Sequence, residues 1–403
     1  MSAMAKVCHE RPKPRFPFDP IAFPAVPGVS VRPVEGKRDL DAFIKLPFRL
    51  HRGTPWVPPL IFERRGFLDR DENPFFEHAE GEYFLAERDG EVVGRITAHV
   101  DERWTQFQGG NDGMFGFFEC ENDPEVARAL LETAMGWLRE RGRERMLGPM
   151  DFTTNDECGL LIEGYELDPM VLEPWHPPYY RELLEVLGMG KTMDLLMWEL
   201  HLGRLKQGDH FHDFIEDAAR TSEAEHGVTV RQMRKSDLEA EISRFMEVYN
   251  AAWGPNWGFV PVTEEEVRFQ AKNLKPILDE NWAMIAEREG EVVGAALTLP
   301  DINQVLAKMN GRVLPFGWWH FLSGRRKIDR VRVFALGVKP EYQHYGVAAA
   351  LYVRHKEVAA RVRQKGGEMG WILETNEPMN RAMEGMGGTI VKRYRLYELP
   401  LAP

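Results

Sequence analysis

Residues 86–94 read AERDGEVVG, and residues 286–294 read AEREGEVVG. The two stretches differ only at Asp89 and Glu289. In each, a dipeptide ending in glycine stands between two apolar, strand-like runs, which is typical of a β-hairpin. The near-identity predicts that one hairpin is used twice in a chain of 403 residues.

The sequence around each hairpin is also repeated. VSVRPVEGKRDLDAFIKL precedes the first hairpin and VTVRQMRKSDLEAEISRF precedes the second. After each hairpin, a strand leads into an amphipathic helix, predicted from Pro124 to about Arg141 and from Gly346 to about Gln364. GMGKTMDLLMWEL closes the first half and GGTIVKRYRLYEL closes the second. We therefore predict two copies of one β-α-(α)-β-β-β-α-β-α-β unit.

The predicted fold class is α+β, with mixed β-sheets flanked by helices. We divide the chain into a proline-rich arm (1–28), a first repeat (29–205), a linker helix (206–227) and a second repeat (228–403). Each repeat carries its own insertion, at about 151–178 in the first and about 301–328 in the second.

Composition excludes several classes of protein. The net charge of −12 argues against nucleic acid as the main partner, because a phosphate-binding surface needs a basic field. The three cysteines, Cys8, Cys120 and Cys158, fit neither a disulfide framework nor a zinc site, so no metal is expected. No stretch is long and apolar enough to span a bilayer, and a reducing cytoplasm is the simplest setting.

The stretch with the clearest chemical content is RVRVFALGVKPEYQHYGVAAALYVRHKEVAARVRQKG, residues 330–366. A predicted strand ends near Val338, a short loop follows, and a helix begins near Gly346. The loop pattern Gln343-x-x-Gly346-x-Ala348 suits an anion, because backbone N–H groups and the positive end of a helix dipole converge there. Glycine and alanine allow a pyrophosphate to approach closely.

This segment resembles motif A of the GNAT superfamily of acyl-CoA-dependent N-acyltransferases. The downstream WILETNEPMNRAMEGMGG (371–388) resembles the fifth strand and following helix of that family. The resemblance implies acyl-CoA as co-substrate. It implies that Leu336, Gly337 and Val338 line the pantetheine arm and that Asn376 lies beside the thioester. It further implies that the pyrophosphate is held by Gln343, His344, Tyr345, Gly346, Val347 and Ala348.

The first repeat lacks this loop. Its equivalent reads ECENDPEVAR, where Asp123 is a good helix cap and Pro124 a good first-turn residue. Glu121 and Glu125 add carboxylates where a pyrophosphate would have to lie, and like charges repel. We predict that this half binds no CoA and serves a structural or acceptor-binding role. The tandem plan resembles mycothiol synthase and the Fem-type aminoacyl transferases.

The catalytic residues are less well defined by the sequence. The family's usual tyrosine, seven residues after Asn376, is replaced by Met383, and the strand-four glutamate is absent. An amine must lose a proton to attack a thioester, so an acid or base is needed. The candidates are Glu374, His344 and Tyr345 in the second repeat, and His176, Tyr179 and Tyr180 in the first.

Two segments are candidates for acceptor recognition. In NAAWGPNWGFVPVTEEEV (250–267), an aromatic wall with amide donors is predicted from Asn250, Trp253, Asn256, Trp257 and Phe259, with ordinary core packing as the alternative. In VLPFGWWHFLSGRRKIDR (313–330), aromatic residues precede a basic cluster. That pattern suits weak contact with a membrane interface through 313–328, or a lid packed on its own core.

These features favour transfer of a long acyl chain from CoA to a lipid-like amine. NWGFVP, LPFG, WILETN and YRLYE together resemble tandem GNAT-type proteins of bacterial sphingolipid synthesis, the ceramide synthase-like proteins. That resemblance implies a sphingoid base as acceptor. Two alternatives stay open: an N-acetyltransferase for small polar amines, and a non-catalytic acyl-CoA-binding protein. An apolar channel under 313–322 would favour the lipid acceptor. The oligomeric state is not specified.

Overall fold

The structure is a computed structural model that describes residues 28–200, 213–254, 256–362, 364 and 366–401. The proline-rich arm, apart from Gly28, residues 201–205 of the first repeat and residues 206–212 of the predicted linker helix lie outside this range. The elements of the first repeat are β1 (Ser30–Pro33), α1 (Gly36–Leu50), α2 (Ile61–Leu68), β2 (Ala79–Arg88), β3 (Glu91–Asp101), α3 (Glu102–Gln108), β4 (Asp112–Cys120), α4 (Pro124–Glu140), β5 (Arg145–Gly148), β6 (Leu160–Glu163), α5 (Tyr179–Val186) and β7 (Gly190–Leu200).

The second repeat follows the same order. After the helix α7 (Asp213–Ala224) come β8 (Val228–Gln232), α8 (Leu238–Trp253), α9 (Glu264–Leu274), β9 (Ala283–Arg288), β10 (Glu291–Pro300), α10 (Asn303–Met309), α11 (Gly317–Gly324), β11 (Arg330–Val338), α12 (Val347–Arg361), β12 (Gly366–Leu373), α13 (Glu377–Gly385) and β13 (Thr389–Pro400). The predicted repeat and both predicted insertions are confirmed: β6 lies in the first insertion, and α10 and α11 lie in the second.

The repeated hairpins form as predicted. Asp89 and Gly90 have φ of 53° and 81°, and Glu289 and Gly290 have 52° and 84°. Positive φ at both central positions is the signature of a type I′ turn, whose twist matches that of the flanking strands.

The glycine that ends each copy of EVVG has a packing role. A Cβ at Gly94 would lie 2.7 Å from Leu130 Cδ1 of α4. A Cβ at Gly294 would lie 2.9 Å from Val347 Cγ1 of α12. The same glycine therefore lets the same helix approach the sheet in both halves.

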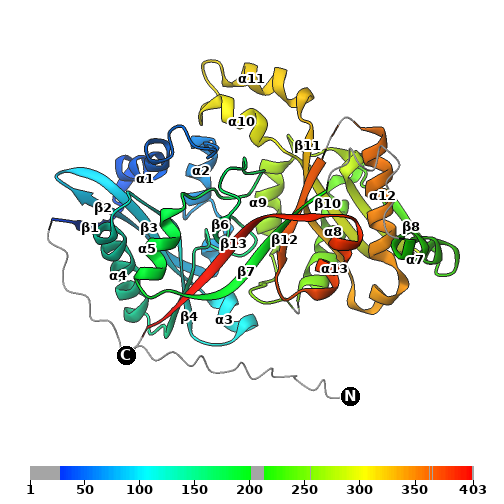
Figure 1. Cartoon of the computed structure of the whole chain (residues 1–403), viewed down its shortest axis with the longest axis horizontal. Helices are drawn as coiled ribbons and strands as arrows, with labels where there is room; N and C mark the ends of the chain where they lie inside the picture. The colour runs from blue at the N-terminus through cyan, green and yellow to red at the C-terminus, as the bar shows by residue number, and fades with distance from the viewer. Residues whose placement is uncertain (1–27, 201–212, 255, 363, 365, 402–403) are drawn as a thin grey trace.

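The strands of both repeats form one continuous sheet, because the two closing strands are exchanged (Figure 1). β13, the last strand of the second repeat, pairs with β5 of the first. β7, the last strand of the first repeat, pairs with β12 of the second, and β7 and β13 pair with each other. The sequence analysis assigned each closing strand to its own repeat. In the structure, each closing strand pairs with strands of the other repeat.

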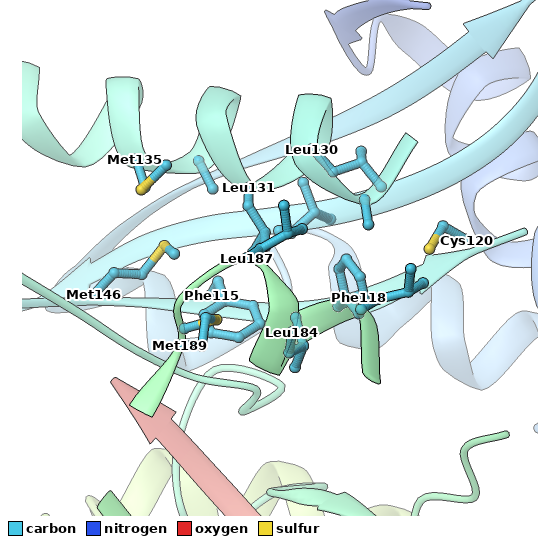
Figure 2. Packing of buried hydrophobic residues seen from close by; sticks show 14 of the residues in the cluster. Phe115, Phe118, Cys120, Leu130, Leu131, Met135, Met146, Leu184, Leu187 and Met189 are labelled. Carbon is cyan, nitrogen blue, oxygen red and sulfur yellow. The ribbon is translucent and has the colours of Figure 1, made fainter. Parts of the chain in front are cut away.

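The core of the first half lies between the sheet and helices α4 and α5 (Figure 2). The predicted apolar stripe of α4 is buried, with Ala127, Leu131, Ala134 and Leu138 each at most 2% exposed. Figure 2 shows Leu130 and Leu131 of α4 above Phe115 and Phe118 of β4. Within the described residues, no helix has both the length and the apolar character needed to cross a bilayer.

Candidate functional site

In the second half, β11 and β12 diverge and leave a gap between them. They pair in parallel from Arg330 and Gly366 to Val333 and Met369, and then separate. Val338 is opposite Gly294 of β10, and Lys339 N–H donates to Val293 O at 3.0 Å. Because N–H directions alternate along an antiparallel pair, Val338 N–H points away from β10 and into the gap.

The loop after β11 has the geometry expected of an anion-binding turn. Residues Pro340–Tyr345 form a 3-10 turn, Gly346 has φ of 72°, and α12 begins at Val347. The first N–H groups of a helix have no partner within the helix, and its dipole is positive at that end. Gln343 and His344 are exposed, so the outer face of this loop is open to a ligand. The residues present therefore fit the pyrophosphate of CoA.

The equivalent gap in the first half is filled by the chain itself. Cys120 is opposite Gly94, and Glu121 N–H donates to Val93 O at 3.0 Å, which makes Cys120 the counterpart of Val338. Cys120 N–H donates to the Tyr180 hydroxyl at 3.0 Å, and the Tyr179 hydroxyl donates to Cys120 O at 2.9 Å.

A second contact closes the same gap nearer to its base. Met150 N–H donates to Phe115 O at 2.9 Å, and Phe117 N–H donates to the Asp151 carboxylate at 2.7 Å. A Cβ at Gly116 would lie 2.0 Å from Met150 O, so the segment after β5 lies directly on β4. These contacts leave no space for a pantetheine arm along β4.

A large cavity of about 760 Å³ lies between the first half and the insertion of the second half. Its wall combines residues of α1 and α2, the end of β4, the insertion after β5, α9, α10 and α11. From α10 and α11 it receives Leu306, Met309, Trp318, Phe321 and Leu322. Residues Val313, Trp318, Phe321 and Leu322 thus supply part of the apolar wall of a cavity, at the place where the lipid-acceptor hypothesis expected an apolar channel.

The residues predicted from the CoA motif do not line this cavity. Asn376 caps α13, with its side chain accepting from Met379 N–H at 3.3 Å. Tyr345 packs against His226, with ring centroids 4.8 Å apart, and beneath Arg288. Both residues thus stabilise the second half around the gap.

The Glu374 side chain is hydrogen-bonded to β7, one of the two exchanged strands. Its carboxylate accepts from Asp194 N–H at 3.1 Å and from Lys191 Nζ at 2.7 Å. Those two residues belong to β7, so Glu374 fastens the end of β12 to the strand supplied by the first half. It does not line the cavity.

The predicted acceptor wall at 250–259 lies mainly in the contact between the halves. Phe259 O accepts from the Gln108 side chain at 2.7 Å, and the Trp257 ring lies 6.0 Å from Trp104. The Asn250 side chain exchanges hydrogen bonds with Val262. These contacts are consistent with the packing role that was the alternative, and acceptor binding by these residues stays a prediction.

The Trp253 ring of α8 packs against β11, the strand predicted to line the pantetheine arm. A Cβ at Gly337 would lie 2.1 Å from the Trp253 ring, so this glycine makes room for the indole. Side chains alternate along a strand, and Val338 shares the face of Gly294, which packs on α12. Trp253 of α8 therefore covers the opposite face of the sheet from α12.

The two acceptor candidates of the first half differ in position. Tyr179 is used in closing the gap, as described above, and does not line the cavity. His176 does line the cavity and is only 8% exposed. Its Nδ1 accepts from Leu161 N–H at 3.1 Å, and burial lowers its pKa to about 4. The imidazole is therefore neutral and carries its hydrogen on Nε2.

Sequence reasoning missed the most polar part of the cavity wall. It consists of carboxyl groups from α2 and from the first insertion, Glu63, Asp151, Asp156 and Glu157. The one available signal was the acidic content of DFTTNDE (151–157) inside an insertion. Nothing in that stretch distinguishes a cavity wall from a solvated loop. Among the described residues, no group of three His, Cys, Asp or Glu is arranged to hold a metal ion.

Comparison with known proteins found two related sequences and solved structures with the same fold. No family model matches the chain. The bacterial ceramide synthase of Caulobacter vibrioides (strain NA1000 / CB15N) is 37% identical over 384 residues, which cover 93% of this chain and 98% of that protein. Protein YghO of Escherichia coli (strain K12) is 35% identical over 376 residues, covering 91% and 94%. A tandem GNAT protein from the clavulanic acid biosynthesis pathway shares the fold, with a TM-score of 0.52, 14% identity, and coverage of 93% and 99%.

Proposed function

This chain belongs to the family of bacterial ceramide synthase and has a tandem GNAT fold, and from that membership we propose that it transfers a long acyl chain from CoA to a lipid-like amine. The family and fold make it an acyl-CoA-dependent N-acyltransferase. The proposal concerns the two substrates: a long-chain acyl-CoA as donor and a sphingoid-base-like amine as acceptor.

The single observation that supports long, apolar substrates is the cavity. Its volume of about 760 Å³ is within the range of pockets that enclose a drug-sized or lipid-sized ligand. Most of its lining is hydrophobic, including Trp56, Phe67 and Trp175 from the first half. A small polar amine and an acetyl group would leave most of this apolar surface without a partner.

We assign CoA itself to the second half, residues 228–403. The gap between β11 and β12, the turn at Gly346 and the start of α12 together suit pantetheine and pyrophosphate. Val338 N–H is the donor that would stabilise the oxyanion of the thioester carbonyl. The first half, with its own gap filled, supplies the cavity wall instead. Catalysis in this arrangement comes largely from positioning the two substrates.

The expected result that tests this proposal is a dependence on acyl chain length. Affinity should rise from acetyl-CoA to octanoyl-CoA to palmitoyl-CoA, because each buried methylene contributes about 0.8 kcal/mol. Calorimetry with the full-length protein measures the three affinities directly. A long-chain 2-amino-1,3-diol should then be acylated by palmitoyl-CoA.

Equal affinity for the three thioesters would contradict the long-chain donor and favour a small-molecule acetyltransferase. Binding of palmitoyl-CoA without acylation of any amine would support the non-catalytic alternative. Absence of binding to all three would contradict the assignment of the Gly346 turn.

We further propose that α11 contacts a bilayer surface from which the lipid substrates enter. Leu314, Phe316, Trp319 and Leu322 are 55–73% exposed. The adjacent residues Arg325, Arg326 and Lys327 are exposed and basic, in a chain of net charge −12. Figure 1 shows α10 and α11 at the periphery of the molecule, and α11 also lines the cavity. Aromatic residues beside basic ones suit the interface of an anionic membrane.

Vesicle flotation should therefore recover the protein with vesicles that contain anionic lipid, and less with purely zwitterionic ones. The double variant Phe316→Ser/Trp319→Ser should lose most of this binding, because it removes two exposed aromatic anchors. Phe107→Ser is the matched control: Phe107 is 56% exposed but lies on α3. Equal flotation of the wild type and the double variant would contradict the bilayer contact.

A further inference from the structure

The acidic part of the cavity wall has too few cations to balance it. Arg64 pairs with Glu157 at 2.9 Å and lies 3.9 Å from Asp151. Asp156 is held instead by neutral groups: the Thr153 hydroxyl donates to it at 2.9 Å and the Gln270 side chain at 3.3 Å.

In the part of the chain that the structure describes, no lysine or arginine lies within ion-pairing distance of Asp156. Two other carboxylates on the cavity wall are compensated. Glu119 accepts from Tyr180 and contacts His51, and Glu173 is paired with Lys392 at 2.9 Å. A buried carboxylate without a cationic partner costs stability, and groups with perturbed titration cluster at functional sites.

His176 provides an independent sign that the cavity is built for a polar ligand group. Its Nδ1 is used by Leu161, and the opposite ring nitrogen, Nε2, has no hydrogen-bond partner within the described residues. The residue is more than nine-tenths buried and borders the cavity, so Nε2–H is available to a ligand group there. A neutral imidazole N–H donates to a hydroxyl or carbonyl oxygen and not to an ammonium group.

We propose that this wall is the recognition site for the head group of the acceptor, a long-chain amino alcohol. This inference rests on the proposed function, and it adds where the acceptor head group binds and which residues recognise it. The amine, which arrives as an ammonium ion, lies against Asp156, with Asp151 and Glu157 adding negative potential. The hydroxyl next to the amine accepts from His176 Nε2–H, and the apolar tail lies along the hydrophobic wall.

The same carboxylate can prepare the amine for attack. One proton moves from the ammonium nitrogen to an Asp156 carboxylate oxygen, which leaves a lone pair on nitrogen. The C–N bond then forms while the C–S bond of the thioester breaks, and the second proton leaves with the CoA thiol. Burial raises the pKa of Asp156 to about 7, where a carboxylate is both available and basic at neutral pH.

Other charged groups around Asp156 also affect its titration. Asp151 and Glu157 come from the same loop, Glu63 and Arg64 from α2, and Glu266 and Lys272 from α9. The acids outnumber the cations in this set, so the surroundings favour the protonated form of Asp156 until the substrate ammonium ion arrives.

The acidic loop is joined to the strand that would carry the thioester. The Tyr249 hydroxyl donates to Asn155 Oδ1 at 2.7 Å, next to Asp156. The Tyr249 ring lies 4.5 Å from the Trp253 ring, which packs on Gly337 of β11. The acidic loop of the first half is therefore linked through Tyr249 and Trp253 to β11 of the second half.

The decisive variant is Asp156→Asn, which keeps the shape and can still accept from Thr153. Its kcat/KM for a long-chain 2-amino-1,3-diol should fall by about a hundredfold or more, while palmitoyl-CoA affinity stays unchanged. The acidic limb of the wild-type pH profile, near pH 7, should be lost. Asp168→Asn is the matched control, since Asp168 is exposed in the same insertion and does not line the cavity.

A ligand comparison tests the site without any variant. Wild-type protein should bind the amino diol about tenfold or more tightly than the same long-chain diol without nitrogen, and Asp156→Asn should lose most of this difference. Equal affinities in the wild type, or full activity of Asp156→Asn, would overturn this site while leaving the acyltransferase proposal intact. A wild-type protein that binds palmitoyl-CoA but acylates no amine would overturn the proposed function instead.

Discussion

Replacing Gly346 with Asp is expected to reduce acyl-CoA affinity by about a hundredfold or more, equivalent to ~2.8 kcal/mol. The substitution places a carboxylate in the turn that would hold the pyrophosphate, where like charges repel at short range. The backbone at residue 346 also has φ of 72°, a conformation that glycine adopts without strain. Calorimetry with palmitoyl-CoA measures the loss.

The control must separate charge from packing. A Cβ at residue 346 would lie 2.6 Å from Ala218 O of α7, so any side chain there disturbs the linker helix. Gly346→Ala has the same strain without the charge, and it should bind more tightly than Gly346→Asp. Gln343→Glu is a second test, because Gln343 is exposed and its change adds only charge. If both acidic variants bind palmitoyl-CoA as the wild type does, the turn is not the pyrophosphate site.

Replacing Lys392 with Met is expected to cost about 3–5 kcal/mol of stability, because it leaves buried carboxylates without their main counter-charge. Lys392 Nζ lies 2.9 Å from Glu173 and 2.7 Å from Glu368, and all three side chains are at most 1% exposed. The three residues join β13, β12 and the first insertion, so the cluster lies where the closing strands cross. The midpoint of urea unfolding, followed by tryptophan fluorescence, measures the change.

Lys191→Met is the matched control. Lys191 also bridges β7 and the end of β12, through Asp194 at 3.0 Å and Glu374 at 2.7 Å, but its side chain is 39% exposed. Exposed ion pairs contribute little, so this variant should lose less than about 1 kcal/mol. A Lys392→Met protein as stable as Lys191→Met would show that the buried cluster is not important for joining the halves.

The local features of this protein could be predicted from the sequence because they depend on neighbouring residues. The DG and EG dipeptides predict the hairpin turns at Gly90 and Gly290, and the structure has positive φ at both. The apolar spacing in 124–141 predicts α4, which runs from Pro124 to Glu140. The Gln343-x-x-Gly346-x-Ala348 pattern predicts a loop followed by a helix that begins near Gly346, and α12 begins at Val347.

The candidate site was only partly predictable. His176 was singled out by its neighbours in HPPYY, and it does line the cavity. Asp156 was not, because an aspartate in a loop has the same local sequence whether it faces solvent or a cavity. Trp257 and Phe259 were expected at the acceptor, but they also contact Trp104 and Gln108 of the first half, and local sequence does not distinguish these two roles.

The sequence by itself thus determined that one fold is present twice, where its hairpins turn, and which copy has the glycine turn before its helix. Only the tertiary structure decided that β7 and β13 are exchanged and that the cavity is shared between the halves. The physical reason is that turns and helices are specified by residues a few positions apart. The partner of a strand, and the wall opposite a carboxylate, are specified by contacts between segments more than a hundred residues apart.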